Sequence, residues 1–445
     1  MRASHTSPAI ANRKVHETFT LRRATRYGGF NVLSDFVAAQ GIDRALTGAF
    51  GQDKAPWATY SLPETLRHLL DGYLLGVERV WHFADLEQEP LLCVKRDRER
   101  LPDYTLLYRD LARFETPGAL SRLHTLGEGL LRQALAAQPW YTLDCDSTVE
   151  TVYGEQDGAR LGPNPHKRGR ASYHPLLCRE RKSGLMVHSQ LRPGDTGSAT
   201  GAVAFLCQSV ARLPSSRRRT VLIRADRGFD VEALYARCER RRWHYVIKLR
   251  VTADLASRIW THAAHGRWRV VDAEAVIPIE VAELRFRRGC WSRVRRVGLT
   301  RRRDAENPQG HLWDAAGYNY AAYVTDVDWA PEDVVAFYDK RADMEKAIHE
   351  LKEDFGIDRI PSSAFGANAA DLALKVLAFN LLVLYQRQAL GWAGLQRAKT
   401  LRRRVIAIAG QLIRTAGQWM LKLADGWAGH ADLARVRQPL ATLGP

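Results

Sequence analysis

The chain has 445 residues, of which 46% are hydrophobic and 26% charged, a composition that excludes wholesale disorder. Its 66 Lys and Arg residues against 49 Asp and Glu give a net charge of +17, which favours nucleic acid over a membrane surface as partner. Six separated cysteines without a C-x-x-C motif argue against zinc or disulfides and favour a reducing cytoplasm. The longest apolar stretch, residues 376–385, is short and contains Asn380, so no transmembrane span is expected.

The N-terminal part of the chain is predicted to be helical. Residues 1–24 are expected to form a flexible basic arm, and residues 25–138 a helical region that binds DNA. Ser61 and Glu64 have the spacing of a capping box, and apolar residues then recur at helical spacing up to Leu74.

The middle of the chain predicts a mixed sheet covered by helices. Residues 139–249 contain strand patterns with β-branched residues and a hairpin that turns at Ser183 and Gly184, followed by a strand–helix–strand unit. Residues 250–330 lose the helical period and are interpreted as a β-rich insertion. A strong helix is expected from Pro331 to about Phe355, within a core segment 331–365. Residues 366–445 are predicted to be basic and helical.

Three acids are candidate metal ligands. Asp146 and Asp226 lie at the ends of predicted strands, and Glu345 lies in the helix after Pro331. Carboxylates at strand ends face the crevice where ligands bind in α/β sheets, and Mg²⁺ prefers oxygen ligands. Asp144 shares the strand face of Asp146, so either could be the ligand and the other a supporting residue. Taken singly, such acids are more often turn formers or helix caps.

The helix around Glu345 carries a distinctive set of side chains. Tyr338, Arg341, Glu345 and Lys352 fall on one narrow face, beside an apolar stripe. Arg341 and Lys352 are suited to phosphate contacts, although a solvated face with an Arg341–Glu345 pair explains the spacing nearly as well. His349 shares the face of Glu345 and could orient water.

These four residues match the Y-(2)-R-(3)-E-(6)-K signature of bacterial insertion-sequence transposases of the DDE type. Within the group of the fourth insertion-sequence family, the chain most resembles the thirteen-eighty family. The resemblance covers residues 60–425 and includes the segments LDCDST at 143–148, NPHKRGR at 164–170, YHPLL at 173–177, LRPGDT at 191–196 and RADRGF at 224–229. Relatives usually carry Ser after the second Asp, where this chain has Arg227.

The resemblance implies an α/β fold with an RNase H-like core, interrupted by a β-rich insertion between Asp226 and Glu345. It implies that Asp146, Asp226 and Glu345 bind two Mg²⁺ ions, for which Mn²⁺ can substitute. Tyr338, Arg341 and Lys352 would then hold the phosphates of the transposon end. The expected activity is cut-and-paste transposition on double-stranded DNA, at terminal inverted repeats and target DNA. A dimer is expected in the synaptic complex, in the nucleoid-containing cytoplasm of a bacterium and without membrane association.

Further basic residues are candidate DNA contacts. Two sets are Lys167, Arg168 and Arg170 in a loop and Arg402, Arg403 and Arg404 near the C-terminus. The segment 285–303 holds nine arginines and no acid, with Phe286 and Trp291 available for stacking on an unpaired base. His166 and His174 are possible helpers near the site. Two alternatives stay open: a catalytically inactive, transposase-derived DNA-binding protein, and an RNase H-type nuclease without joining activity.

Overall fold

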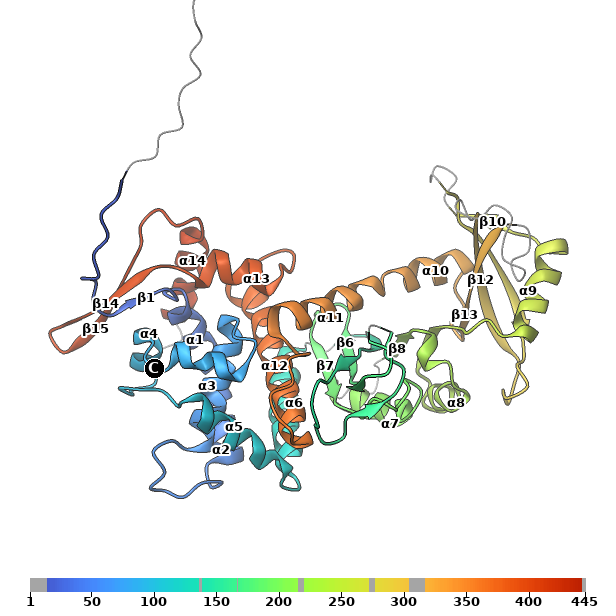
Figure 1. The fold of residues 1–445 in the computed structure, drawn as a ribbon. Helices are drawn as coiled ribbons and strands as arrows, with labels where there is room; N and C mark the ends of the chain where they lie inside the picture. The colour runs from blue at the N-terminus through green and yellow to red at the C-terminus, as the bar shows by residue number, and fades with distance from the viewer. Residues whose placement is uncertain are drawn as a thin grey trace, which may run out of the picture.

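The computed structural model describes residues 14–135, 138–165, 167–214, 220–271, 277–303 and 317–441. The molecule is elongated, with a helical body at one end, a core sheet in the middle and a β-rich extension at the other end (Figure 1). The fold is mixed α/β, as predicted.

The helical body begins with elements from the N-terminal part of the chain. They are β1 (Ala24–Thr25), α1 (Phe30–Ala39), α2 (Ile42–Phe50), α3 (Leu62–Leu75), η1 (Val80–Leu86), α4 (Pro90–Lys95), α5 (Tyr104–Ala112), η2 (Arg113–Glu115) and α6 (Ala119–Ala134). The predicted capping box is present, because the Ser61 hydroxyl accepts from Glu64 N and the Glu64 carboxylate accepts from Ser61 N. Nearly all of α3 is buried, so this helix lies inside the body.

The core sheet places two of the candidate acids at one edge. Its strands β2 (Trp140–Ser147), β6 (Leu176–Glu180), β7 (Met186–Gln190), β8 (Thr220–Ala225) and β9 (His244–Lys248) have the order β9-β8-β2-β6-β7. Strands β2, β8 and β9 are parallel, and β6 is antiparallel to both β2 and β7. The strands are covered by α7 (Ala202–Ala211) and α8 (Glu232–Arg241), with η3 (Arg227–Phe229) directly after β8. This sheet and its helices form the mixed, helix-covered core that the sequence predicts for residues 139–249.

The β-rich segment extends the core sheet. It contains α9 (Ala253–His265), β10 (Arg269–Val270), β11 (Glu280–Phe286), β12 (Arg295–Arg303) and β13 (Tyr318–Thr325). Strand β13 pairs antiparallel with β9, so the insertion and the core share one nine-stranded sheet. A smaller sheet of β3 (Glu150–Thr151), β4 (Arg160–Leu161) and β5 (Ala171–Tyr173) follows β2.

The helix predicted from Pro331 is divided into α10 (Pro331–Asp339) and α11 (Ala342–Phe355). The break falls at Lys340 and Arg341, so Arg341 stands directly before α11 instead of within a continuous helix.

The C-terminal part of the chain is only partly helical. It contains α12 (Phe365–Leu384), η4 (Tyr385–Ala389), α13 (Ala398–Leu401), η5 (Arg402–Ile406), β14 (Gly410–Thr415), β15 (Gln418–Leu423) and α14 (His430–Ala441). The prediction of helix across 410–423 is wrong, because these residues form a hairpin that also pairs with β1. Ala416 and Gly417 both have positive φ, as a tight two-residue hairpin turn requires.

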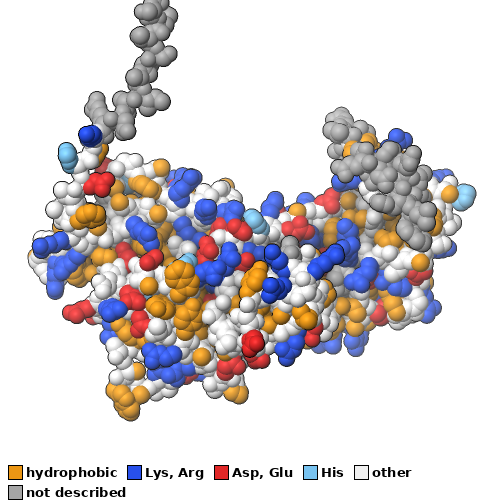
Figure 2. Space-filling model, in the orientation of Figure 1, with side chains coloured by type: hydrophobic (Ala, Val, Ile, Leu, Met, Phe, Trp, Pro, Cys, Tyr) orange, Lys and Arg blue, Asp and Glu red, His pale blue; other side chains and the backbone are white. Residues whose placement is uncertain are grey.

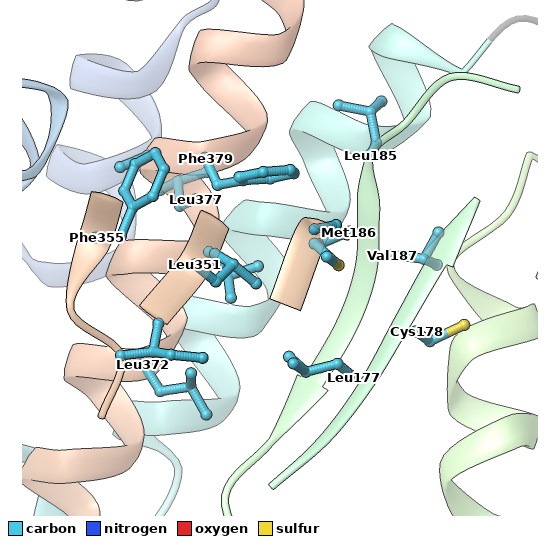
Figure 3. Close-up of a cluster of buried hydrophobic side chains, with 14 of the residues drawn as sticks. Leu177, Cys178, Leu185, Met186, Val187, Leu351, Phe355, Leu372, Leu377 and Phe379 are labelled. Carbon is cyan, nitrogen blue, oxygen red and sulfur yellow. The ribbon is translucent and has the colours of Figure 1, made fainter. Parts of the chain in front are cut away.

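Helix α12 joins the helical body to the core sheet. It packs on α3, α5 and α6 on one side and on β7 and α11 on another. Figure 3 shows Leu372, Leu377 and Phe379 of α12 beside Leu351 and Phe355 of α11, near strands β6 and β7. One helical stretch, Phe365–Ala389, is long and apolar enough to cross a membrane, but 94% of its most apolar window is buried inside the protein. It is therefore the central helix of the core.

Candidate active site

Asp146 and Asp226 lie side by side at the carboxyl edge of the core sheet. Cys145 of β2 is paired with Ala225 of β8, and each aspartate is the next residue of its chain segment. Asp146 accepts a hydrogen bond from Ser147 N at 2.8 Å, and Asp226 accepts one from Gly228 N at 2.9 Å. Parallel pairing of two strands thus brings together acids that are far apart in sequence.

Arg341 joins Glu345 to this edge. Its Nη2 lies 2.5 Å from Asp146 Oδ2, and its Nη1 lies 2.8 Å from Glu345 Oε1. The guanidinium is buried, whereas the Glu345 side chain is 65% exposed. Burial raises the pKa of Asp146 to about 6, Arg341 opposes this shift, and the charges of Asp226 and Glu345 add to it. Three carboxylates and one guanidinium therefore form a single electrostatic cluster, which we call the acidic cluster.

Asp144 has a different role from Asp146. Both of its oxygens accept hydrogen bonds from Arg224 of β8, at 2.5 and 2.8 Å, and both side chains are completely buried. Arg224 also donates to the carbonyl of Phe337 in α10. Asp144 thus stabilises the packing of β2, β8 and α10 from inside the core. It supports the acidic cluster and is not a member of it.

The other residues of the signature helix are spread over different environments. Tyr338 is 8% exposed and packs on Tyr323 with ring centroids 4.6 Å apart, and burial raises its pKa. Lys352 Nζ donates to the carbonyl of Val149 at 3.1 Å, just beyond the end of β2. His349 is exposed. Arg341 and Glu345 therefore contact the cluster directly, and Lys352 borders it.

The family described as "Transposase DDE domain group 1" matches residues 7–445 of the chain. The protein belongs to this DDE transposase family. No curated protein matches the chain. Among solved structures, a cryo-EM structure of a piggyBac transposase synaptic complex with hairpin DNA is similar with a TM-score of 0.45 and 11% sequence identity. The match covers 85% of this chain and 80% of that one.

The loop after β4 presents basic side chains of this transposase to solvent. Lys167, Arg168 and Arg170 are all exposed, and Arg170 lies 6.0 Å from the ring centroid of Tyr153. His166 lies outside the described residues. His174 is buried, with Nδ1 bonded to the Thr196 carbonyl, and burial lowers its pKa. It therefore supports a loop and is not an exposed helper.

The C-terminal arginines differ in availability. Arg402 donates to the carbonyls of Tyr73, Leu74 and Asp354, so its guanidinium is unavailable to a DNA phosphate and the prediction for this residue is wrong. Arg404 is paired with Asp432 at 2.9 Å, although its side chain is 51% exposed. Arg403 is exposed.

The arginine-rich segment 285–303 is largely neutralised in the fold. Acids outside the segment pair with five of its arginines at 2.5–3.0 Å: Asp230, Glu232, Glu239, Glu280 and Glu283. Phe286 and Trp291 are 6% and 2% exposed. The expected stacking on an unpaired base is therefore wrong, because both rings are part of the core.

Glu150 is a buried acid that the sequence did not single out. It is 1% exposed, and neither carboxylate oxygen has a hydrogen-bond partner among the described residues. Burial raises its pKa to about 8, and the charges of Lys352 and Lys375 oppose the shift. No spacing signal marks it, because an acid in a short strand is ordinarily solvated.

The acidic cluster supplies the kind of ligand that Mg²⁺ prefers. Its three carboxylates offer hard oxygen donors, and burial, with a smaller contribution from the charges of Asp226 and Glu345, raises the pKa of Asp146. No three acid, histidine or cysteine side chains within the described ranges stand close enough together to hold a metal ion as placed. Arg341 bonds both Asp146 and Glu345, so metal binding by both would require these contacts to loosen.

Proposed function

We propose that the protein is a DNA transposase that cleaves DNA at the ends of an insertion sequence and joins those ends to target DNA. The observation that supports this most directly is the acidic cluster, in which Arg341 links Glu345 to Asp146, beside Asp226, at the carboxyl edge of an RNase H-like sheet. The family supplies the reaction class, because its members are DDE transposases.

Asp146, Asp226 and Glu345 would hold two Mg²⁺ ions, with Mn²⁺ as a substitute. When bound, the ions would activate water or a 3′-hydroxyl and stabilise the leaving oxygen of a phosphodiester. Arg341 keeps Glu345 turned toward Asp146, and its Nε has no partner within the described part of the chain. This nitrogen is buried, so it would bind a phosphate oxygen of the DNA end only after the contacts of Arg341 with the carboxylates loosen.

Lys352 and the exposed basic loop would extend the contact with DNA beyond the reacting phosphate. Lys352 borders the cluster through Val149, and Lys167, Arg168 and Arg170 lie in a loop between β4 and β5. Figure 2 shows Lys and Arg side chains gathered over the middle of this face of the molecule. The terminal inverted repeats would occupy this face, within a dimer that pairs two ends in the bacterial cytoplasm.

The first test removes the carboxylates one at a time. Asp146→Asn, Asp226→Asn and Glu345→Gln should each abolish Mg²⁺-dependent cleavage of a labelled transposon end. Binding of that end should persist, because affinity comes mostly from phosphate contacts. Cleavage at the wild-type rate in any of the three variants would contradict the proposed triad.

A plasmid assay with two paired ends and Mg²⁺ separates this function from its alternatives. Excision with joined product supports a transposase, and nicking without joining supports a nuclease. A mobility shift without cleavage supports an inactive DNA-binding descendant. The control variant is Lys346→Ala, which should give the same products as wild type. It removes a cation that lies on α11 and is 78% exposed.

A further inference from the structure

A small sheet forms a second surface at one corner of the helical body. The hairpin β14–β15 pairs with β1, so the segment that leads out of the N-terminal arm is anchored to the C-terminal part of the chain. Figure 1 places this sheet at the opposite end of the helical body from strands β2 and β8. Five side chains define what we call the hairpin surface: Arg22, Arg23, Arg26, Arg414 and Trp419.

Trp419 is at the centre of this surface, between two arginines. Arg414 is its direct cross-strand partner, with the guanidinium carbon 5.7 Å from the indole centroid. Arg23 approaches the same ring at 5.0 Å, and its carbonyl accepts from Leu412 N. The indole is 41% exposed, so this arrangement of three side chains is open to solvent.

The backbone of Arg23 has a strained conformation. Its φ is +53°, in the left-handed region that residues other than glycine rarely adopt. The neighbouring Thr25 is fixed by a hydrogen bond from its hydroxyl to Glu89, and Ala24 pairs with Gln411. The backbone of Arg23 is therefore ordered, directly before β1.

The charges of the hairpin surface are not neutralised. None of its four arginines lies within 4.0 Å of an acid in the portion of the chain that the structure describes. Three arginines of β12 behave differently, since acids pair with Arg295, Arg296 and Arg301. Positive charge left unpaired on a rigid support attracts a polyanion.

We propose that the hairpin surface docks duplex DNA by its phosphate backbone, at a distance from the acidic cluster. This inference rests on the proposed function, and it adds a second DNA contact that the catalytic edge does not provide. A guanidinium group is planar, and packing over an indole leaves the N–H donors at its edges free, where two phosphate oxygens can accept together. The partner is DNA and not a second hairpin surface, because two such faces would repel each other.

The test measures how DNA affinity depends on salt. Arg23→Gln/Arg414→Gln should lower the slope of log affinity against log salt by about 1.8, since each lost phosphate contact removes about 0.9. The matched control is Arg269→Gln/Arg359→Gln. It also removes two arginines, 59% and 43% exposed, but each of these is paired with an acid. Its slope should stay within about 0.5 of the wild-type value.

Two further measurements complement the salt dependence, and the first of them uses only wild-type protein. Ultraviolet crosslinking of wild-type protein to a bromodeoxyuridine-substituted duplex should yield a crosslinked peptide that contains Trp419. Thermal melts of both double variants report whether they are folded. Absence of the Trp419 crosslink, or an unchanged salt slope in the folded hairpin variant, would overturn the inference. The inference would also be overturned if the hairpin variant lost binding to anionic phospholipid vesicles, or lost self-association, while its DNA affinity stayed unchanged.

Failure of this inference is distinguishable from failure of the proposed function. Wild-type protein that cleaves transposon ends, but whose hairpin variant keeps the wild-type slope, leaves the catalytic proposal standing and removes only the second surface. Wild-type protein that binds DNA through Arg23 and Arg414 without cleaving leaves the surface standing and removes the catalytic proposal.

Discussion

At the scale of single residues, two aspartates two positions apart in one strand have separate tasks. The sequence left Asp144 and Asp146 open as alternatives, because residues i and i+2 share a strand face. The structure distinguishes them by how deeply their side chains are buried. Asp144 is enclosed with Arg224, whereas Asp146 lies at the end of β2 beside Arg341. The partner that decides this is Arg224, 80 positions away, which no local pattern could identify.

Asp144→Asn should therefore destabilise the protein more than Asp146→Asn. The first change leaves the buried Arg224 without its counter-charge, which costs about 3–5 kcal/mol in comparable pairs. The second change leaves Arg341 paired with Glu345, so it should cost much less. Urea unfolding at neutral pH measures the difference. Equal losses of unfolding free energy would show that the Arg224 pair contributes little.

Glu150 should make stability depend on pH. Its pKa of about 8 in the folded protein lies above the ordinary glutamate value, so the folded state holds this proton when the unfolded state has lost it. Stability from this group is complete at low pH and falls as pH rises towards about 8, by about 1 kcal/mol per pH unit.

The measurement compares wild type with Glu150→Gln between about pH 5 and pH 9. The variant is neutral throughout, so its unfolding free energy should exceed that of wild type increasingly as pH rises. Glu353→Gln provides the control, because Glu353 is an exposed acid on α11. A constant difference between wild type and Glu150→Gln across this range would show that Glu150 is ionised in the fold.

At the scale of elements, the apolar period predicted α3 and the strands of the core, but it failed where the contacts are distant. The hairpin β14–β15 was interpreted as helix, because Leu412, Ile413, Leu421 and Leu423 are apolar and lie among helix-forming residues. Its strand pairing is completed by β1, almost the whole chain length away. Similarly, counting arginines in 402–404 and 285–303 did not indicate which of them the fold would neutralise.

Arg402 and Arg403 provide a direct test of that distinction. Arg402 satisfies carbonyls at the ends of α3 and α11 and packs over the Phe355 ring at 4.6 Å. Arg402→Ala should lower the unfolding free energy by about 2–3 kcal/mol, because buried carbonyls lose their donors. Arg403→Ala should change stability by less than about 0.5 kcal/mol. Chemical denaturation of both variants measures this, and equal stabilities would refute the assigned role of Arg402.

At the scale of the whole molecule, the sequence predicts the order of the catalytic segments. It does not predict that the N-terminal and C-terminal parts of the chain pack together. Motifs such as RADRGF placed Asp226 at a strand end, and the insertion after it was expected. The union of the helical region 25–138 with the C-terminal segment was not, because it depends on packing across most of the chain. Tyr73 of α3 donates to Asp371 of α12, and Asp371 is paired with Lys375 at 2.8 Å.

This union implies that the N-terminal helices do not fold by themselves. Helix α3 is buried along nearly its whole length, and α12 forms much of the surface on which α3, α5 and α6 pack. A fragment of residues 14–135 should lack that surface and expose a large apolar face to water. Expressed alone, it should unfold without a cooperative thermal transition, as measured by circular dichroism. Co-expressed with residues 138–441, it should co-purify as a complex that melts cooperatively and binds DNA. A cooperative transition in the isolated fragment would instead show that it is an independent domain. Helix α12 would then pack on the surface of a domain that folds without it, and would not be the centre of one shared core.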